Sequence, residues 1–490
     1  MEHRPGTAES IIVDVVPPIL ISSDGAVGSI PEGEMFSSFE AHKKIYPRSV
    51  SGVFSKWRWG LVLLTQWFFY GLPWLQWGQR QTVLFDLEAR RFYIFGLVLY
   101  PQDFIYLSGL LVISALSLFL FTAVAGRLWC GFTCPQTVYT EVFLWVEHWI
   151  EGDRSARLRR DAAPMSGDKF VRKGGKHLVW ILFSLWTGFT FVGYFTPILE
   201  LGAESVAFQL SAWEIFWILF YALAIYGSAG FLREQVCKYM CPYARFQSAM
   251  FDHDTLIVTY DEQRGDPRGA RSRKADPVRL ELGSCVDCSL CVQVCPTGID
   301  IREGLQYECI GCGACADVCD TVMDKMGYAR GLVRFSTQNA VLNRWNHLQI
   351  VRRILRPRVL VYVAILGGVT AALALSLSLR VPFRVDVVHD RSAVVRELDG
   401  GLLENVYSLQ LMNATETAQQ FKIGVHGLPD IRLASNELVT VGATESRWFA
   451  ARVQVPADVS KSGSYPIQFE IEALSGVGHV SEKSVFLLPH

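Results

Sequence analysis

Two cysteine-rich stretches decide the fold: residues 285–296 (CVDCSLCVQVCP) and residues 309–319 (CIGCGACADVC). In each stretch, two, two and three residues separate four successive cysteines. Three thiolates at such short intervals let a tight loop wrap three corners of an iron–sulfur cubane, and the fourth cysteine of each run ligates the other cluster. The spacing therefore predicts two [4Fe–4S] clusters whose ligands cross between the runs.

The crossing assigns four thiolates to each cluster. The first cluster is held by Cys285, Cys288, Cys291 and Cys319. The second cluster is held by Cys309, Cys312, Cys315 and Cys295. This is the pattern of a bacterial-type 2[4Fe–4S] ferredoxin domain, although Asp320 follows the last cysteine where proline is usual. Zinc is the alternative metal for CxxC pairs, but two interlocked four-cysteine runs favour iron–sulfur clusters.

Four more cysteines form two CxxxCP motifs, at 130–135 (CGFTCP) and 237–242 (CKYMCP). If the local chain is helical, Cys130 and Cys134 project from one face with Cβ atoms about 5–6 Å apart, as do Cys237 and Cys241. A disulfide needs about 3.5–4.5 Å, so a shared metal suits each pair better. Soft thiolates favour Cu(I). We therefore predict a copper site at these four thiols, with buried structural cysteines as the alternative.

Other side chains near these motifs are weaker candidates. Arg127, Arg233 and Lys238 can lower the pKa of the thiols, or anchor the helix ends at the membrane interface. His148 and His253 can join a metal site, but we expect both at the surface. The chain has no CxxCH motif for covalent haem and no Gly-rich dinucleotide fingerprint, so the electron donor is unknown.

Five apolar runs are long enough to cross a bilayer, which takes about 20 helical residues. They lie near 58–77, 104–126, 177–198, 212–231 and 358–379. Pro73 interrupts the first run. We therefore predict a multi-domain membrane protein with a five-helix transmembrane region.

The distribution of basic residues predicts the orientation. Lysines and arginines precede the first run and gather in the 127–176 loop and the 232–357 insert, whereas the 199–211 loop has two glutamates and no basic residue. The N-terminus and the insert are therefore expected in the cytosol, and the segment after the fifth span in the periplasm. This is the topology of a multi-pass protein of the bacterial cytoplasmic membrane.

The chain divides into five predicted regions. Residues 1–41 are polar and expected to be disordered, and residues 42–231 form the membrane region with four helices. Residues 232–357 are a cytosolic insert with the ferredoxin domain at about 275–325, followed by the fifth helix at 358–379. In residues 380–490, stretches such as FKIGV and YPIQFEIEA alternate apolar and polar residues, which predicts an external Ig-like β-sandwich. We expect a structural or docking role for it.

These motifs together resemble the CcoG/FixG/RdxA family of cytochrome c oxidase accessory proteins. The resemblance rests on RLWCGFTCPQTVYTEVF, REQVCKYMCPYARFQSAMFD and the double cysteine run, and extends from about residue 45 to residue 332, then more loosely to the C-terminus. It implies a role in assembling the cbb3-type oxidase, with copper-handling proteins as partners. It also implies reduction of Cu(II) to Cu(I) at Cys130, Cys134, Cys237 and Cys241.

Three hypotheses about function follow. The first is a cupric reductase whose clusters pass electrons to copper at the CxxxCP thiols. The second is a quinol-linked membrane electron-transfer protein without a copper site, and the third is an assembly scaffold whose clusters only hold the insert folded. A formal net charge of −1 argues against a nucleic-acid partner, which would require a strongly basic face.

Overall fold

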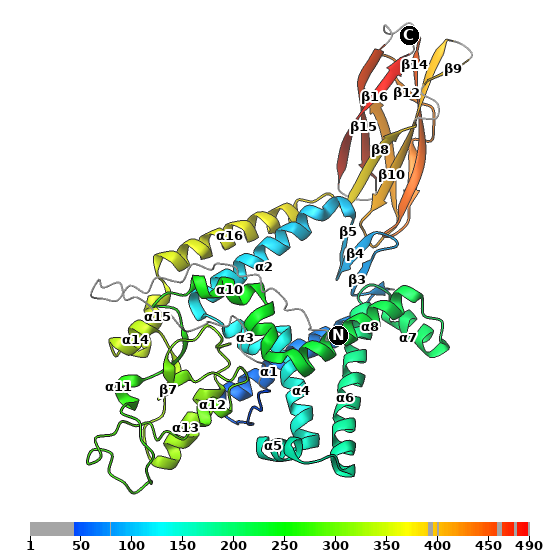
Figure 1. The fold of residues 1–490 in the computed structure, drawn as a ribbon. Coiled ribbons are helices and arrows are strands. Elements are labelled where there is room, and N and C mark those ends of the chain that lie inside the picture. Colours follow the sequence, from blue (N-terminus) through cyan, green and yellow to red (C-terminus); the bar gives the residue numbers. More distant parts are fainter. Residues whose placement is uncertain are drawn as a thin grey trace, which may run out of the picture. The chain divides into compact units, whose positions relative to one another are not determined.

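A computed structural model of the chain describes residues 44–78, 80–390, 395–398, 401–457, 463–474 and 478–488. The predicted disorder of residues 1–41 lies outside these residues. Helices dominate the first three quarters of the chain and strands the last quarter (Figure 1).

A long helix occurs at each of the five predicted spans. They are α1 (Val53–Gly71), α2 (Phe104–Ala125), α6 (Gly167–Val192), α8 (Ala212–Gly227) and α16 (Pro357–Ser378). Within the described residues, length and composition qualify three stretches as candidate membrane spans: Pro101–Ala125, Ala212–Met240 and Pro357–Ser378. The chain is therefore a membrane protein. The count of five crossings stays a prediction.

The helices α1 and α6 begin earlier than the predicted spans at 58–77 and 177–198. Helix α1 ends at Gly71 because Pro73 follows in the short 3₁₀ turn η1 (Leu72–Trp74), and proline lacks the amide that would continue the helix. Helix α6 begins at Gly167, where the Ser166 hydroxyl accepts a hydrogen bond from the Lys169 amide. Its first turns carry charged residues, so only its later part is apolar.

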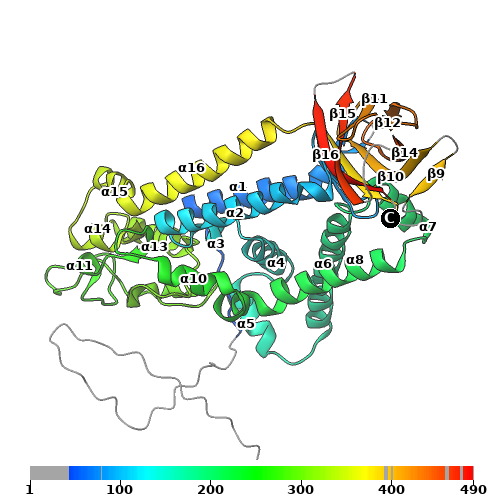
Figure 2. The ribbon, with the colours of Figure 1, turned by 90° about the horizontal axis from the view of Figure 1, so that it is seen from above.

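Short helices connect the long ones around the CxxxCP motifs. They are α3 (Leu128–Phe132), α4 (Pro135–Glu151), α5 (Arg154–Ala162), α7 (Ile198–Ala207) and α10 (Pro242–Met250). Helix α8 continues through η3 (Ser228–Leu232), α9 (Arg233–Gln235) and η4 (Val236–Met240). Helices α2 and α16 run side by side (Figures 1 and 2), and Gly109 faces Leu373 so closely that a Cβ would lie 2.7 Å from its Cδ1.

The cysteine-rich insert is closed by a pair of antiparallel strands, β6 (Ile257–Tyr260) and β7 (Val333–Ser336). Between them lie α11 (Glu262–Gly265), α12 (Leu290–Gln293), η5 (Ile301–Glu303) and α13 (Ala314–Met326). Strand β7 is followed, still within the insert, by α14 (Gln338–Leu342) and α15 (His347–Ile354). Tyr260, Met323 and Leu332 form part of a buried core with the cysteines. The paired strands extend the folded unit beyond the predicted 275–325.

The C-terminal region is a sandwich of two antiparallel sheets. One sheet has the order β12-β14-β10-β8, with β9 paired to β10, and the other has the order β13-β11-β15-β16. The strands are β8 (Phe383–His389), β9 (Arg396–Leu398), β10 (Leu402–Asn413), β11 (Gln419–His426), β12 (Arg432–Leu433), β13 (Leu438–Val441), β14 (Ser446–Pro456), β15 (Gly463–Ala473) and β16 (His479–Leu488). Side chains of alternate residues fill the space between the sheets, including Tyr407, Phe421 and Phe469. The alternation predicted from the sequence is confirmed.

Between α1 and α2, a small sheet contacts this sandwich. The segment contains β1 (Gln76–Trp77), β2 (Arg80–Gln81), β3 (Val83–Asp86), β4 (Arg91–Ile94), β5 (Leu97–Leu99) and the 3₁₀ turn η2 (Pro101–Asp103). Tyr100 packs against Met412 and donates a hydrogen bond from its hydroxyl to the Asn413 carbonyl at 2.9 Å. The buried Asp103 carboxylate forms ion pairs with Arg380 and Arg384. The segment before α2 and the segment after α16 therefore meet.

At the other end of α1, the insert supplies the helix cap. The Asp317 carboxylate, on α13, accepts hydrogen bonds from the amides of Phe54 at 3.1 Å and Ser55 at 2.8 Å. A helix leaves its first four amides without partners inside the helix, and Gly52, the residue before α1, offers no side chain to satisfy them. A Cβ on Gly52 would lie 2.2 Å from the Asp317 Cγ. Glycine at 52 is therefore required by the approach of the carboxylate.

We predict that Asp317→Ala destabilises the protein by about 1–3 kcal/mol, because two amides then lose a charged acceptor. The matched control is Asp324→Ala on the same helix, whose partner Arg330 is solvent-exposed, so its loss should change the stability far less. Thermal unfolding of the detergent-solubilised chain measures both. Equal shifts in the melting temperature would contradict the capping role.

Candidate metal centres and the membrane-facing thiols

Each set of four predicted cluster ligands lines a cavity of its own. One cavity is lined by Cys285, Cys288, Cys291 and Cys319, and the second by Cys295, Cys309, Cys312 and Cys315; Cys291 also lines the second cavity. The crossing between runs is achieved by α13, which carries both Cys315 and Cys319 and directs them to different cavities. Four thiols around one cavity fit the donor set that a [4Fe–4S] cluster requires.

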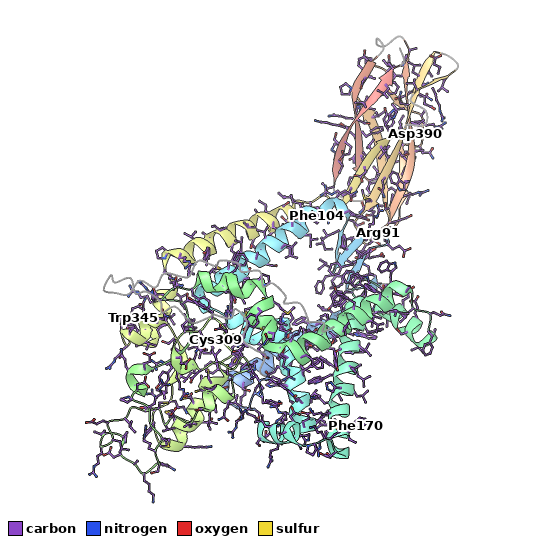
Figure 3. The ribbon with its side chains drawn as sticks, in the orientation of Figure 1. Arg91, Phe104, Phe170, Cys309, Trp345 and Asp390 are labelled. Carbon is purple, nitrogen blue, oxygen red and sulfur yellow. The ribbon has the colours of Figure 1, made fainter. Side chains whose placement is uncertain are left out.

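Glycines let the second loop approach α1. Gly311 and Gly313 have φ values of +68° and +73°, a region that residues with a Cβ rarely adopt. A Cβ on Gly313 would also lie 2.8 Å from the Phe54 Cγ. The loop that presents Cys309, Cys312 and Cys315 is therefore shaped by its glycines. Figure 3 labels Cys309 on this loop.

Burial controls the protonation of these thiols. It raises the pKa of Cys309 to about 12 and that of Cys315 well above its usual value. Burial likewise raises the pKa of Cys291 to about 11, and the Arg302 guanidinium partly opposes it. Arg302 is held in place by Asp300 at 2.6 Å. These three thiols are therefore protonated at neutral pH when free, and a bound metal centre would supply the positive charge that deprotonates them.

The CxxxCP motifs depart from the predicted helical geometry. Cys130 lies in α3, but Cys134 precedes α4 with φ −58° and ψ 129° and caps that helix. Cys241 precedes α10 in the same way, with φ −79° and ψ 111°. The expectation that both thiols of a pair lie on one helix is therefore wrong, because the proline after each second cysteine starts a new helix and pushes the preceding residue into extended backbone.

The capping position places Cys134 where a helix attracts negative charge. The backbone amides of Gln136 and Thr137 lie close to its sulfur and oppose the burial that raises its pKa. Burial also raises the pKa of Cys130 to about 11, and the neighbouring Cys134 and Cys241 thiols act in the same direction. Cys130 donates to the Gln247 Oε1 at 3.5 Å, and Gln247 is fully buried. All four thiols thus lie close enough to influence one another electrostatically.

A buried cluster of charges joins the two motifs. The Glu147 carboxylate, on α4, forms ion pairs with Arg157 at 3.0 Å, Lys176 at 3.5 Å and Arg233 at 3.0 Å. Arg233 begins α9, just before Cys237, and α4 begins just after Cys134. Removing one partner from such a buried network is strongly destabilising. The network therefore fixes the two CxxxCP motifs relative to each other, and Arg233 serves as an anchor.

The structure brings the first CxxxCP motif against the second cluster cavity. A Cβ on Gly131 would lie 2.8 Å from the Cys312 Cα and amide nitrogen, and a Cβ on Gly311 would lie 3.2 Å from the Arg127 carbonyl carbon. Cys130 and Cys237 both pack beside Cys312 in one buried apolar cluster. The Arg127 guanidinium opposes the burial-raised pKa of both Cys130 and Cys309. The CxxxCP thiols and the second cluster cavity are therefore immediate neighbours.

Some predicted candidates lie elsewhere. The His148 ring lies 3.2 Å from Asp153, and the His253 ring lies 2.6 Å from Gln338. Within the described residues, no group of three His, Cys, Asp or Glu side chains is arranged to hold a single metal ion. The sharing of one copper ion by four thiols therefore stays a prediction. Gly131, Gln247 and Asp317 were not identified as functional residues from the sequence. Among them only Gly131 is conspicuous in the sequence, because it lies inside a CxxxCP motif.

Comparisons with known proteins agree with this architecture. Residues 232–338 match the family described as "4Fe-4S dicluster domain", residues 107–156 match "4Fe-4S binding domain", and residues 373–489 match "IG-like fold at C-terminal of FixG". A FixG-related protein from Vibrio parahaemolyticus has a crystal structure that is 24% identical over 22% of this chain and 98% of that chain, with a TM-score of 0.20. That likeness is too slight to carry an argument.

Three relatives are similar over most of their length. The nitrogen fixation protein FixG of Rhizobium meliloti is 38% identical, with 80% of each chain covered. Proteins RdxB and RdxA of Cereibacter sphaeroides are 37% and 38% identical, covering 85% and 79% of this chain and 90% and 83% of theirs.

The fold and the cysteine sites define a membrane iron–sulfur protein with an Ig-like C-terminal domain. The chain belongs to the FixG/RdxA/RdxB family. The predicted family resemblance is confirmed. The iron–sulfur nature of the chain is supported, and the assignment of individual ligands stays a prediction.

We predict that each crossing cysteine controls the cluster of the other run. Cys295→Ser should damage the cluster ligated by Cys309, Cys312 and Cys315, and Cys319→Ser should damage the other. The wild type should contain about eight irons and eight labile sulfides per chain. Iron analysis and EPR after dithionite reduction measure the loss. If Cys295→Ser altered only the EPR signal that Cys285→Ser also alters, the crossing assignment would be wrong.

Proposed function

We propose that this chain is a redox enzyme that accepts single electrons at its cysteine-rich insert and reduces Cu(II) to Cu(I) at Cys130, Cys134, Cys237 and Cys241. The Cu(I) product would serve assembly of the cbb3-type cytochrome c oxidase. The observation that carries the proposal is the packing of Gly131 onto the backbone of Cys312, because it puts the CxxxCP thiols next to the second cluster cavity.

The exposure of the cysteines supports a direction for the electrons. Cys288, in the first set, is exposed. Cys312, in the second set, is buried in the cluster against which Cys130 and Cys237 pack. When bound, [4Fe–4S] clusters exchange one electron at a time. A donor would therefore approach the first set, and the second set would face the substrate. Each Cu(II) takes one electron and becomes Cu(I), so the stoichiometry is one oxidised cluster for one Cu(I).

The residues around the thiols suit a transient copper substrate. Thiolates bind Cu(I) in preference to harder ions, and the N-terminus of α4 favours the thiolate at Cys134. The Arg127 guanidinium favours the thiolate of Cys130 in the same way. The chain therefore provides soft ligands that suit the reduced ion, Cu(I).

Contacts at the two ends of the membrane helices support five crossings. Gly131 and Phe54 both contact the insert, so the segments before α1 and after α2 lie on the side of the insert. Tyr100 contacts the sandwich, so the segment before α2 lies on the other side. Gln81 donates to the Gly193 carbonyl at 2.7 Å, so the end of α6 also lies there. Crossings by α1 and α6, in addition to the three apolar helices, would satisfy all these contacts.

The excess of Lys and Arg on the side of the insert supports a cytosolic orientation. The Ig-like domain would then be periplasmic, in the cytoplasmic membrane of a bacterium. The thiols would face the cytosolic end of the bundle, where glutathione and thioredoxin keep them reduced.

We predict that Ser at Cys130, Cys134, Cys237 or Cys241 abolishes Cu(II) reduction and leaves both clusters intact, because the two cysteine runs already supply eight ligands. Serine keeps the size of the side chain and loses the soft thiolate. Cu(I) formation by dithionite-reduced, desalted protein is followed with a Cu(I)-specific chelator, with cluster EPR as the control. Wild-type rates in a well-inserted quadruple variant would contradict the copper assignment and favour the quinol-linked alternative.

The contact at Gly131 yields a second test. Gly131→Ala should slow Cu(II) reduction by at least about tenfold with all thiols present, because the added Cβ pushes α3 away from the Cys312 loop and reacting groups must be held in position. Gly227→Ala is the matched control, since a Cβ at Gly227 meets no atom within 4 Å. Similar rates in the two variants would show that the close packing is not required.

A further inference from the structure

The start of helix α16 contains an open pocket that the proposed redox function does not use. The pocket has a volume of about 640 Å³ and is lined by Trp345, Gln349, Asp254 and four arginines. The arginines are Arg352, Arg353, Arg356 and Arg358. Figure 3 labels Trp345 at this end of the molecule, and Figures 1 and 2 both draw α15 at the base of α16.

The position of the pocket relative to the bilayer follows from α16. The candidate span Pro357–Ser378 begins within the pocket lining, so the arginines stand at the headgroup level. Helix α15 and the residue that follows it add apolar side chains at spacings of three and four: Leu348, Val351 and Leu355, with exposed fractions of 77%, 46% and 68%. An exposed apolar face beside basic residues is typical of a helix that lies in the membrane interface.

The arginines have more donors than the protein satisfies. Arg353 donates to Asp254 at 2.9 Å, and Arg356 and Arg358 share Asp252 at 3.0 Å and 3.3 Å. Four arginines thus face two aspartates. Arg352 has no partner among the described residues. The Arg356 side chain is only 9% exposed, and its Nε is buried without a hydrogen-bond partner. Each guanidinium carries five N–H donors, so the pocket presents unused donors and an excess of positive charge.

Simple anchoring of a helix end does not explain this arrangement. An anchoring arginine extends toward the headgroups with its charge in water, whereas Arg356 is buried and donates to the Ala123 carbonyl at the end of α2 at 2.6 Å. Arg356 is thereby held between α2 and α16, and it also lines the pocket. The held guanidinium of Arg356 and the free guanidinium of Arg352 can both donate hydrogen bonds to the oxygens of one phosphate group.

We propose that this pocket binds the phosphodiester headgroup of an anionic phospholipid, such as phosphatidylglycerol. The phosphate accepts hydrogen bonds from Arg352 and Arg356, and the acyl chains lie along the apolar face of α15 and the exposed side of α16. A zwitterionic headgroup also carries a cationic ammonium group, which the excess of positive charge in the pocket repels. The lipid would hold α15, and with it the end of the insert, against the membrane.

The test uses the full chain in a neutral detergent, with native mass spectrometry after titration with phosphatidylglycerol or phosphatidylcholine of identical acyl chains. Phosphatidylglycerol should bind at least about tenfold more tightly. Arg352→Gln should weaken that binding about fivefold, the expected effect of one arginine near an anionic surface. The control is Arg279→Gln in the insert, whose side chain is 87% exposed and which should bind like the wild type.

Three results would overturn the proposal. They are equal affinity for the two lipids, wild-type affinity in Arg352→Gln, and displacement of phosphatidylglycerol by inorganic phosphate at constant ionic strength. The last result would mean that the pocket takes a free phosphate and not a lipid. Cluster EPR of Arg352→Gln should match the wild type, which excludes misfolding as the cause of weaker binding.

Discussion

The close approach of two backbones, at Gly131 in one CxxxCP motif and at Cys312 in the cysteine-rich insert, is the constraint on which the rest of the structure depends. Gly131 tolerates no larger side chain, because an added Cβ would overlap the backbone of the partner loop. The contact joins a motif at the end of a membrane helix to a domain that follows more than a hundred residues later. An electron path of immediate neighbours is possible only because these two segments meet.

A helix cap and a buried ion-pair network hold the CxxxCP motifs and the insert in that position. The Asp317 carboxylate caps α1 and so attaches this helix to the insert. The buried Glu147 carboxylate pairs with Arg157, Lys176 and Arg233 and so joins α4, α5, α6 and α9. Both devices use buried charge, which is stable only when every partner is present. The membrane helices and the insert therefore form one unit.

Much of this architecture was predictable from local pattern. The spacing of cysteines groups the same eight residues that line the two cavities, and alternation in residues 380–490 predicted the sandwich. The geometry of the CxxxCP motifs was not predictable, because the prolines at 135 and 242 begin new helices that periodicity alone does not reveal. Asp317, Gln247 and Glu147 were also missed. Their roles arise from contacts between distant segments, and a single sequence carries no signal for such contacts.

The most direct test of the central claim is a single-turnover experiment with no external reductant. Protein is reduced, desalted and mixed anaerobically with excess Cu(II), while cluster absorbance and Cu(I) are recorded together. If the two clusters feed the CxxxCP thiols, about two Cu(I) should form per chain, in step with the reoxidation of both clusters, and the quadruple Ser variant should keep its clusters reduced on this timescale. Cluster reoxidation without Cu(I), or Cu(I) formation at the same rate without the four thiols, would contradict the account.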